Sequence, residues 1–300
     1  MSAVDLGATL YVPATRDGAA RVAYGGCPDL RSMVICLEDA VNEADLDEAR
    51  ERFCDLLRQF KATPPPVLIY ARPRSVEMLS WMLKQDGIAA IEGFVLPKVT
   101  NASLPFWLSV LVQSGHSFMP TIETEEAFDR SALKRMRDQL LPYAERVKAI
   151  RVGGNDILNI LGVRRSRERT AYEGPLGDVI RAIALTFIPC GFAVSAPVFE
   201  HYGSPQVLQR EVEQDIEHGL LTKTAIHPTQ LALIHGCYRP AATEMAEARQ
   251  VLDREARAVF GMNGSMCEPA THRRWAGTVI ERAQVYGVRP EIHDVNSQVA

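Results

Sequence analysis

Carboxylate and arginine side chains follow short apolar runs at several places along the chain. Glu38 and Asp39 follow one such run, Arg72 closes the next, and Glu123 and Asp156 follow two later ones. Carboxylate oxygens are ligands that Mg²⁺ prefers, and a guanidinium group can bind a carboxylate through two parallel hydrogen bonds. These residue types, brought together, are typical of a site where a divalent cation and arginines share a small anionic substrate.

The segment KAIRVGGNDILNILG places two glycines between an apolar run and a helical pattern. Gly153 and Gly154 carry no side chain, so a substrate or metal-bound carboxylate can approach their backbone and accept hydrogen bonds from their amides. Asp156 adds a hard oxygen donor. An alternative interpretation is that Asn155 or Asp156 caps the following helix. That alternative explains one of these two residues and neither glycine.

Eight apolar runs, each followed by a helix-compatible segment, must position these residues. The runs occupy residues 9–14, 33–40, 66–73, 93–99, 117–124, 148–156, 191–199 and 222–228. Strands this uniformly apolar are typical of parallel sheets covered by helices. Eight such units in about 240 residues predict a (β/α)8 TIM barrel, in which the C-terminal ends of the strands meet at one face. A doubly wound open sheet is the main alternative.

The remaining residues predict a C-terminal helical extension. A helical pattern covers residues 241–260 and another covers 271–287, with a glycine-containing turn between them. We therefore expect a barrel domain over residues 1–240 and a helical extension over residues 241–300.

Composition and charge exclude several classes of protein. The 300 residues are 47% hydrophobic with a net charge of -4, so no basic face is indicated for nucleic acid or an acidic membrane. The six cysteines form no CxxC pair, and no long apolar run or signal segment is present. These observations predict a cytoplasmic protein with reduced thiols that binds neither nucleic acid nor membrane.

Seven motifs in order along the chain resemble the citrate lyase β-subunit-like branch of the HpcH/HpaI aldolase superfamily. They are LYVPATR, CLEDAV, ARPR, GFVLPKV, TIET, RVGGND and KTAIHPTQ. The resemblance implies a (β/α)8 barrel with a C-terminal helical extension, assembled as a homotrimer or hexamer. It also implies Mg²⁺ or Mn²⁺ as cofactor and a reaction that makes or breaks a carbon–carbon bond next to a carboxylate.

The resemblance further implies roles for individual residues. Glu123 and Asp156 are the expected metal ligands, and Arg72 is the expected clamp for the substrate carboxylate. Glu38 and Asp39 are the expected paired acids beside the metal, which orient water or move protons. The other residues expected to bind substrate are Arg16, Lys98, Gly153, Gly154 and Asn155.

Two positions depart from the family pattern. Asn155 stands where relatives that handle acyl-CoA usually have an acid, and Ser195 stands where many have an aspartate. The resulting site is less negative, which favours a divergent member whose substrate differs from citryl-CoA.

The predicted function is a Mg²⁺-dependent carbon–carbon lyase or aldolase that acts on a small carboxylated substrate, with a CoA thioester as one candidate, through a metal-stabilised enolate. A class II 2-oxo-acid aldolase without CoA is an alternative, although no histidine precedes His116 to act as its base. A Schiff-base aldolase using Lys98 is another, which would leave the carboxylates without a purpose. The non-enzymatic alternative is a regulatory barrel subunit that binds a ligand.

Overall fold

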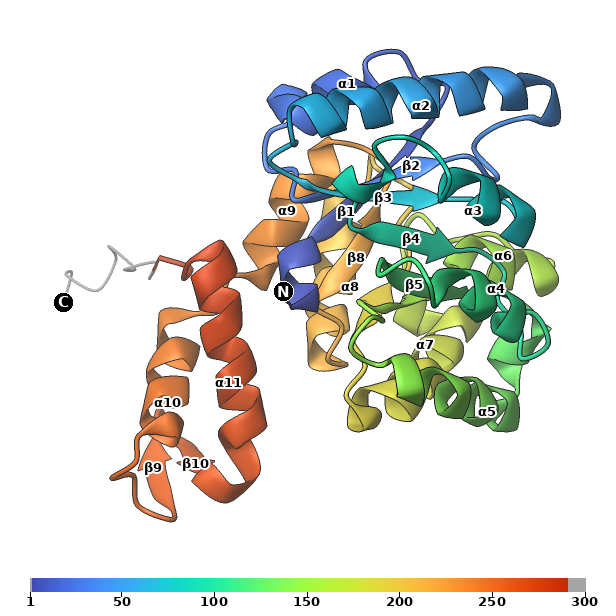
Figure 1. Ribbon diagram of the computed structural model, residues 1–300. Helices are drawn as coiled ribbons and strands as arrows, with labels where there is room; N and C mark the ends of the chain where they lie inside the picture. Colours follow the sequence, from blue (N-terminus) through green and yellow to red (C-terminus); the bar gives the residue numbers. More distant parts are fainter. Residues whose placement is uncertain (1, 291–300) are drawn as a thin grey trace. The chain divides into compact units, whose positions relative to one another are not determined.

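The computed structural model describes residues 2–290 and shows a closed barrel of eight parallel strands. The strands follow chain order around the barrel, and β1 pairs with β8 to close it (Figure 1). Their bounds are β1 (Ala8–Pro13), β2 (Ser32–Cys36), β3 (Leu68–Arg72), β4 (Gly93–Leu96), β5 (Ser117–Ile122), β6 (Ile150–Val152), β7 (Val194–Ala196) and β8 (Thr222–Ala225). Each strand overlaps the apolar run predicted for it. The TIM-barrel prediction is confirmed, and the open-sheet alternative is wrong.

Helices surround the strands in this first part of the chain (Figure 1). They are α1 (Ala19–Arg21), α2 (Leu46–Ala62), α3 (Val76–Met82), α4 (Leu104–Leu111), α5 (Arg130–Leu140), α6 (Gly154–Ile160), α7 (Pro175–Phe187), α8 (Pro205–Glu217) and α9 (Thr229–Tyr238). In α2, Ala49, Phe53, Leu56, Leu57 and Phe60 are buried. Their three- and four-residue spacing gives the helix one apolar face, which packs against the sheet.

The interior of the barrel changes from apolar to polar along the strands. A buried cluster fills it with Leu6, Val34, Tyr70, Val95, Met119 and Ala149. Every second residue of a strand points to the same face. The next inward positions toward the C-terminal ends are therefore Arg72 on β3, Thr121 on β5 and Arg151 on β6. A layer of polar side chains thus lies directly on the apolar filling.

The chain divides into two compact units between Ile234 and His235. The second unit contains α10 (Ala242–Leu252), β9 (Phe260–Met262), β10 (Ser265–Cys267) and α11 (Pro269–Tyr286). The sequence analysis placed a domain boundary between residues 240 and 241. The last part of the predicted extension, residues 291–300, lies outside the described residues.

The helix predicted over residues 241–260 is wrong beyond Leu252. Residues 253–259 form turns and irregular backbone, and an antiparallel hairpin, β9–β10, follows over residues 260–267. Asn263 and Gly264 connect its strands, and both have positive φ angles, of 50° and 76°. An Asn-Gly pair with this backbone is the typical two-residue hairpin turn. The strands have three residues each, too few to show an alternating pattern in the sequence.

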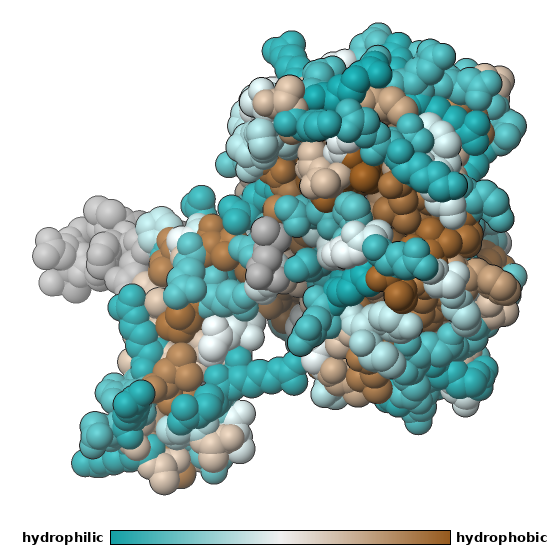
Figure 2. Space-filling view, in the orientation of Figure 1, coloured by the Kyte–Doolittle hydropathy of each residue, from teal (hydrophilic) through white to brown (hydrophobic). Residues whose placement is uncertain are grey.

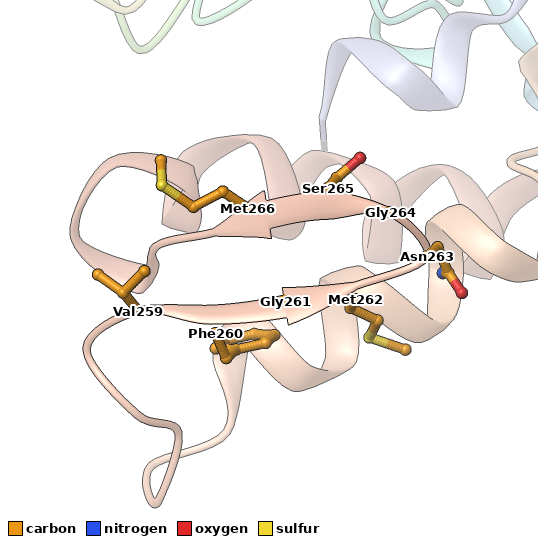
Figure 3. Close-up of a pocket in the computed structure, with 8 residues that line it drawn as sticks. All are labelled: Val259, Phe260, Gly261, Met262, Asn263, Gly264, Ser265 and Met266. Atoms are coloured by element: carbon orange, nitrogen blue, oxygen red, sulfur yellow. The ribbon is translucent and has the colours of Figure 1, made fainter.

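The hairpin contributes one face to the small core of the second unit (Figure 3). Phe260 and Met262 lie on the same side of the hairpin and pack against Ala248, Val251, Cys267, Ala276 and Val279. Val259 and Met266 are mostly exposed. The shallow hollow along the hairpin is lined by no charged side chain. It therefore lacks the groups that would bind an anionic substrate.

The surface of the barrel is mixed in polarity. Figure 2 shows apolar residues gathered near β4 and α4, where Phe106 and Val112 are exposed. All six cysteines are free thiols. Within the described part of the chain, no helix has the length and apolar character needed to cross a membrane.

Candidate active site

A cavity of about 500 Å³ opens where the strands end. This is the face of a (β/α)8 barrel that carries the chemistry in known enzymes of the fold. The predicted site residues that line the cavity are Asp39, Arg72, Glu123, Gly153, Gly154, Asn155 and Asp156. Residues from four different strand–helix units, distant in the sequence, therefore meet in one place.

Glu123, directly after β5, is held in one orientation at the cavity. Its side chain is 2% exposed, and Oε1 accepts hydrogen bonds from the backbone N–H of Lys98 (2.7 Å) and from Nη2 of Arg72 (3.0 Å). Its other oxygen, Oε2, faces Gly153, where an added Cβ would lie 2.1 Å away. Any side chain at position 153 would collide with this carboxylate, so glycine leaves the room in which Glu123 packs.

Burial raises the pKa of Glu123 to about 7, although the nearby charge of Arg72 opposes this shift. The neighbouring charge of Asp156 raises the pKa further. Burial is therefore the main cause of the raised pKa of Glu123, and the charge of Asp156 adds to it. A cation bound beside these two carboxylates would favour the ionised form of Glu123.

Asp156 lies in the first turn of α6, where it forms no hydrogen bond or ion pair with the described residues. The N-cap residue of α6 is Gly153, and no side chain caps the helix. The capping alternative for Asn155 or Asp156 is therefore wrong. The N–H of Gly153 donates to the carbonyl of Ile122 at 3.1 Å, so the amides that remain for a ligand here belong to the first turn of α6.

The donor set fits Mg²⁺ or Mn²⁺ better than Zn²⁺. Within residues 2–290, no group of three or more His, Cys, Asp and Glu side chains is arranged to hold a metal ion. Zn²⁺ needs three or four nitrogen, sulfur or carboxylate ligands from the protein. Mg²⁺ is commonly bound by one or two carboxylates, with waters and substrate oxygens completing the octahedron. Glu123 and Asp156, which both line the cavity, match the second pattern.

Two cations and three carboxylates form a network beside this pair. Nη2 of Arg72 lies 3.1 Å from Oε2 of Glu38 and 3.0 Å from Oε1 of Glu123. Nζ of Lys98 lies 2.7 Å from Oε1 of Glu38 and 2.8 Å from Oδ1 of Asp39. Arg72 therefore orients protein carboxylates as well as facing the cavity. Its buried Nε has no hydrogen-bond partner in the part of the chain that the structure describes.

The network sets the protonation of Asp39 and Lys98. Burial opposes ionisation of Asp39, but hydrogen bonds with Lys98 and Glu38 hold the pKa of Asp39 below its usual value. Burial also opposes the charge on Lys98, but its hydrogen bonds to Asp39 and Glu38 raise the pKa of Lys98. A Schiff-base lysine needs a lowered pKa. The environment of Lys98 therefore argues against the Schiff-base alternative.

Three predicted residues do not line the cavity in the way expected. Glu38 lies outside the lining and contacts the site through Arg72 (3.1 Å) and Lys98 (2.7 Å). Arg16 is exposed and lies outside the lining. Lys98 also lies outside the lining and contacts the site through Asp39. Its backbone φ of 48° is unusual for a residue other than glycine and accompanies the hydrogen bond from its N–H to Glu123.

The sequence analysis missed four residues that line the cavity deeper in the barrel: Tyr11, Thr121, Arg151 and Thr224. Arg151 is 1% exposed, and its Nη2 donates to Oγ1 of Thr224 at 2.7 Å. The available signal was the two-residue period of a strand, which places Arg151 on the same face as Gly153. Arg151 was not predicted because it lies within β6, and the prediction considered only residues that close or follow the strands.

Comparison with known proteins identifies the family. A family model described as carbon–carbon bond lyases of the TIM-barrel fold matches residues 1–288. This chain belongs to that family. The match covers both units of this lyase-family protein, and the predicted family resemblance is confirmed.

Curated relatives of this family member carry two kinds of name. A citrate lyase subunit β-like protein from Mycobacterium tuberculosis is 30% identical over 259 residues, which cover 84% of this chain and 87% of the relative. A (3S)-malyl-CoA thioesterase from Cereibacter sphaeroides is 25% identical over 273 residues, which cover 86% of this chain and 88% of the relative.

Solved structures show the same fold. The CitE protein from Mycobacterium tuberculosis, in complex with magnesium, acetoacetate and coenzyme A, matches with a TM-score of 0.69 and 22% identity, covering 94% of this chain and 99% of that one. The citrate lyase β subunit from M. tuberculosis with oxaloacetate and magnesium matches with a TM-score of 0.59 and 20% identity, covering 80% of this chain and 100% of that one.

Proposed function

We propose that this family member is a Mg²⁺-dependent carbon–carbon lyase that acts on a small carboxylated substrate, with a CoA thioester as the activated form. The observation that carries the proposal is the state of Glu123. Its carboxylate is buried, its pKa is raised to about 7, and it packs against Gly153 at the cavity that Asp156 also lines. A carboxylate in this state gains stability from a bound cation. The names of the relatives support the class of reaction.

Glu123 and Asp156 are the residues that would hold the metal. When bound, Mg²⁺ supplies positive charge that stabilises the negative charge developing on a substrate carbonyl as the bond breaks. The N–H of Lys98 and the guanidinium of Arg72 fix Glu123 before substrate arrives. This arrangement needs no reorganisation during the reaction, which is the main advantage of a preorganised site.

The paired acids, Glu38 and Asp39, have different roles in this proposal. Of the two, Asp39 lines the cavity and has a side chain that is 54% exposed, so we assign proton transfer with the substrate to Asp39. Glu38 is tied by both of its oxygens to Arg72 and Lys98, and its Oε2 also accepts the N–H of Asp39 at 2.8 Å. Glu38 therefore positions Arg72, Lys98 and Asp39 relative to the metal ligands.

Calorimetric titration of Mg²⁺, with and without oxaloacetate, tests the proposal. We expect oxaloacetate to strengthen Mg²⁺ binding in the wild type and the binding to vanish in a Glu123→Ala/Asp156→Ala variant. The matched control is Glu77→Ala/Asp178→Ala, which removes two exposed helical carboxylates and should bind Mg²⁺ as the wild type does. Absence of Mg²⁺ binding in the wild type would overturn the proposal and favour the non-catalytic barrel.

Hydrolysis is a second candidate activity, because the relative from C. sphaeroides is named a thioesterase and is matched over 88% of its length. Malyl-CoA distinguishes the two reactions. Cleavage of its carbon–carbon bond yields glyoxylate and acetyl-CoA, whereas addition of water to its thioester yields malate and free CoA. Trapping of glyoxylate with phenylhydrazine and titration of the free thiol measure the two products separately.

Assembly as a homotrimer or hexamer remains a prediction from the family. Light scattering on the 33.2 kDa chain checks it directly.

A further inference from the structure

Arg151 is a buried cation with no carboxylate partner among the described residues. Its side chain is 1% exposed and points into the barrel. Burying a guanidinium group is unfavourable unless opposite charge and hydrogen bonds replace the lost water. Two other buried arginines obey this rule: Arg165 pairs with Glu211, and Arg282 pairs with Glu244. Arg151 is the exception that needs an explanation.

The protein groups around Arg151 compensate only part of its charge. Nη2 donates to the hydroxyl of Thr224 at 2.7 Å, and Nη1 lies 3.4 Å from the sulfur of Met119. The guanidinium carbon is 5.3 Å from the ring centre of Tyr11, a distance suited to a cation–π contact. Nε has no hydrogen-bond partner among the described residues. All of the partners named are neutral, so none of them compensates the positive charge of Arg151.

The cavity reaches this uncompensated charge. Arg151, Tyr11, Thr121 and Thr224 all line it, and within residues 2–290 the buried hydroxyl of Thr121 also has no hydrogen-bond partner. Thr121 and Arg151 are register partners on β5 and β6, so their side chains point to the same face at the same depth. A cation, a free hydroxyl and an aromatic ring thus converge at the inner end of the cavity.

The distance between this inner end and the candidate metal ligands follows from the spacing of residues along β5 and β6. Glu123 follows Thr121 by two residues, and Gly153 follows Arg151 by two residues. Two residues of an extended strand rise about 6.6 Å. The inner cation is therefore one layer below the carboxylate of Glu123, a separation that a small dicarboxylic acid can bridge.

We propose that Arg151 binds a second anionic group of the substrate, so that the site selects dicarboxylic acids over monocarboxylic acids. This inference rests on the proposed function, because it takes the metal-facing end of the substrate to lie at Glu123 and Asp156. The other carboxylate reaches inward to Arg151, where the hydroxyl of Thr121 adds a hydrogen bond. Arginine suits this role because its planar group binds a carboxylate through two hydrogen bonds and stays charged when buried.

Matched pairs of acids test this selectivity by calorimetry in the presence of Mg²⁺. Oxaloacetate and 2-oxobutyrate form one pair, and 2-oxoglutarate and 2-oxovalerate form a longer one; within each pair the members differ by a terminal carboxylate. We expect the wild type to bind a diacid about 10- to 100-fold more tightly than its matched monoacid. Arg151→Met should bring that ratio close to one while leaving Mg²⁺-dependent binding of the monoacid intact.

Two further variants separate charge recognition from packing. Arg151→Lys keeps the charge and should retain part of the preference for the diacid. Arg146→Met removes an arginine that bonds the carbonyls of His116 and Leu111, so it should lower stability without changing the ratio.

The outcomes distinguish this inference from the function on which it rests. Equal Mg²⁺-dependent affinity for both members of each pair, or a diacid preference that survives in Arg151→Met, overturns the inference and leaves the proposed function standing. Failure of the wild type to bind any of these acids with Mg²⁺ overturns both.

Discussion

Two clusters of charged side chains in the barrel differ in what surrounds them. The mouth cluster consists of Glu38, Asp39, Arg72, Lys98 and Glu123 at the cavity. The sealed cluster consists of Arg165, Glu211, Asp215 and Lys223. In the sealed cluster, Nζ of Lys223 on β8 lies 2.9 Å from Glu211 and 2.8 Å from Asp215, both on α8. These three side chains are fully buried.

The balance of charge distinguishes the candidate site from a structural ion-pair network. The sealed cluster balances two cations against two carboxylates, and the hydroxyl of Tyr172 supplies a further hydrogen bond to Asp215 at 2.7 Å. The mouth cluster opposes three carboxylates to two cations and adjoins the further carboxylate of Asp156. An excess of one charge that is open to a cavity indicates ligand binding, whereas burial and shifted pKa values occur in both places.

Removing one cation from each cluster should give the largest contrast. Lys223→Met leaves Glu211 and Asp215 facing each other without water, so we expect a loss of roughly 3–5 kcal/mol in the free energy of unfolding. Lys98→Met acts on a side chain that is 44% exposed, and we expect a loss of at most about 1 kcal/mol. Urea denaturation at pH 7 measures both. Equal losses would show that the two clusters serve stability alike.

The free energy of unfolding should also depend on pH through Glu123 of the mouth cluster. Because the pKa of Glu123 is raised to about 7, the folded protein binds more protons than the unfolded chain between the ordinary pKa of 4.5 and 7. The stability contributed by this group is present below pH 4.5 and falls as the pH rises through 7, by roughly 2–3 kcal/mol without divalent metal. Urea denaturation from pH 5 to pH 8 should show this decline in the wild type.

The control for that pH series is Glu123→Gln. In this variant the decline in the free energy of unfolding should be smaller by the roughly 2–3 kcal/mol assigned to Glu123. Added Mg²⁺ should also reduce it in the wild type, since a cation favours the ionised carboxylate. A decline of the same size in Glu123→Gln would assign the pH dependence to another group.

Gly153→Ala tests how Glu123 of the mouth cluster packs against position 153. The added Cβ would lie 2.1 Å from Oε2 of Glu123, so the carboxylate or the backbone has to move. We expect a loss of about 1–3 kcal/mol from this overpacking, together with loss of Mg²⁺ binding. The control is Gly203→Ala, because a Cβ added at Gly203 meets no atom within 4 Å. Gly162→Ala is unsuitable, since the φ of Gly162 is positive and would strain an alanine. Thermal unfolding and calorimetry of Gly153→Ala and Gly203→Ala give the comparison.

The smallest effect on stability should come from Asp39→Asn. The pKa of Asp39 is lowered, so its contribution is present above its ordinary pKa of 3.8 and is lost as the pH falls through the folded-state value. Because the side chain is 54% exposed, solvent screening limits that contribution to well under about 1 kcal/mol. Turnover should nevertheless fall strongly, since Asp39 is the proposed proton-transfer group. A large loss of stability with normal turnover would contradict that assignment.

The barrel and the seven predicted residues that line the cavity could be found from the sequence for one physical reason. Parallel strands buried on both faces appear as continuous apolar runs, and the fold then brings the residues that follow them to one rim. The same reasoning was weaker inside the strands, where Arg151 and Lys223 are charged. Which face each side chain takes depends on strand phase, and Glu211 and Asp215 become partners of Lys223 only after α8 packs on β8. The β9–β10 hairpin was missed because its strands are too short to show a period.

The pairing of β1 with β8 has a consequence for how the protein is made. The carbonyl of Gly7 accepts hydrogen bonds from the N–H of Lys223 (3.1 Å) and from the hydroxyl of Thr222 (2.7 Å). The barrel therefore cannot close until the ribosome has released most of the chain, which takes tens of seconds at roughly 5–20 residues per second. During that interval the edge of β1 is an unpaired template for other strands. The first strand of the barrel must therefore stay free of other partners until the last strand has been made.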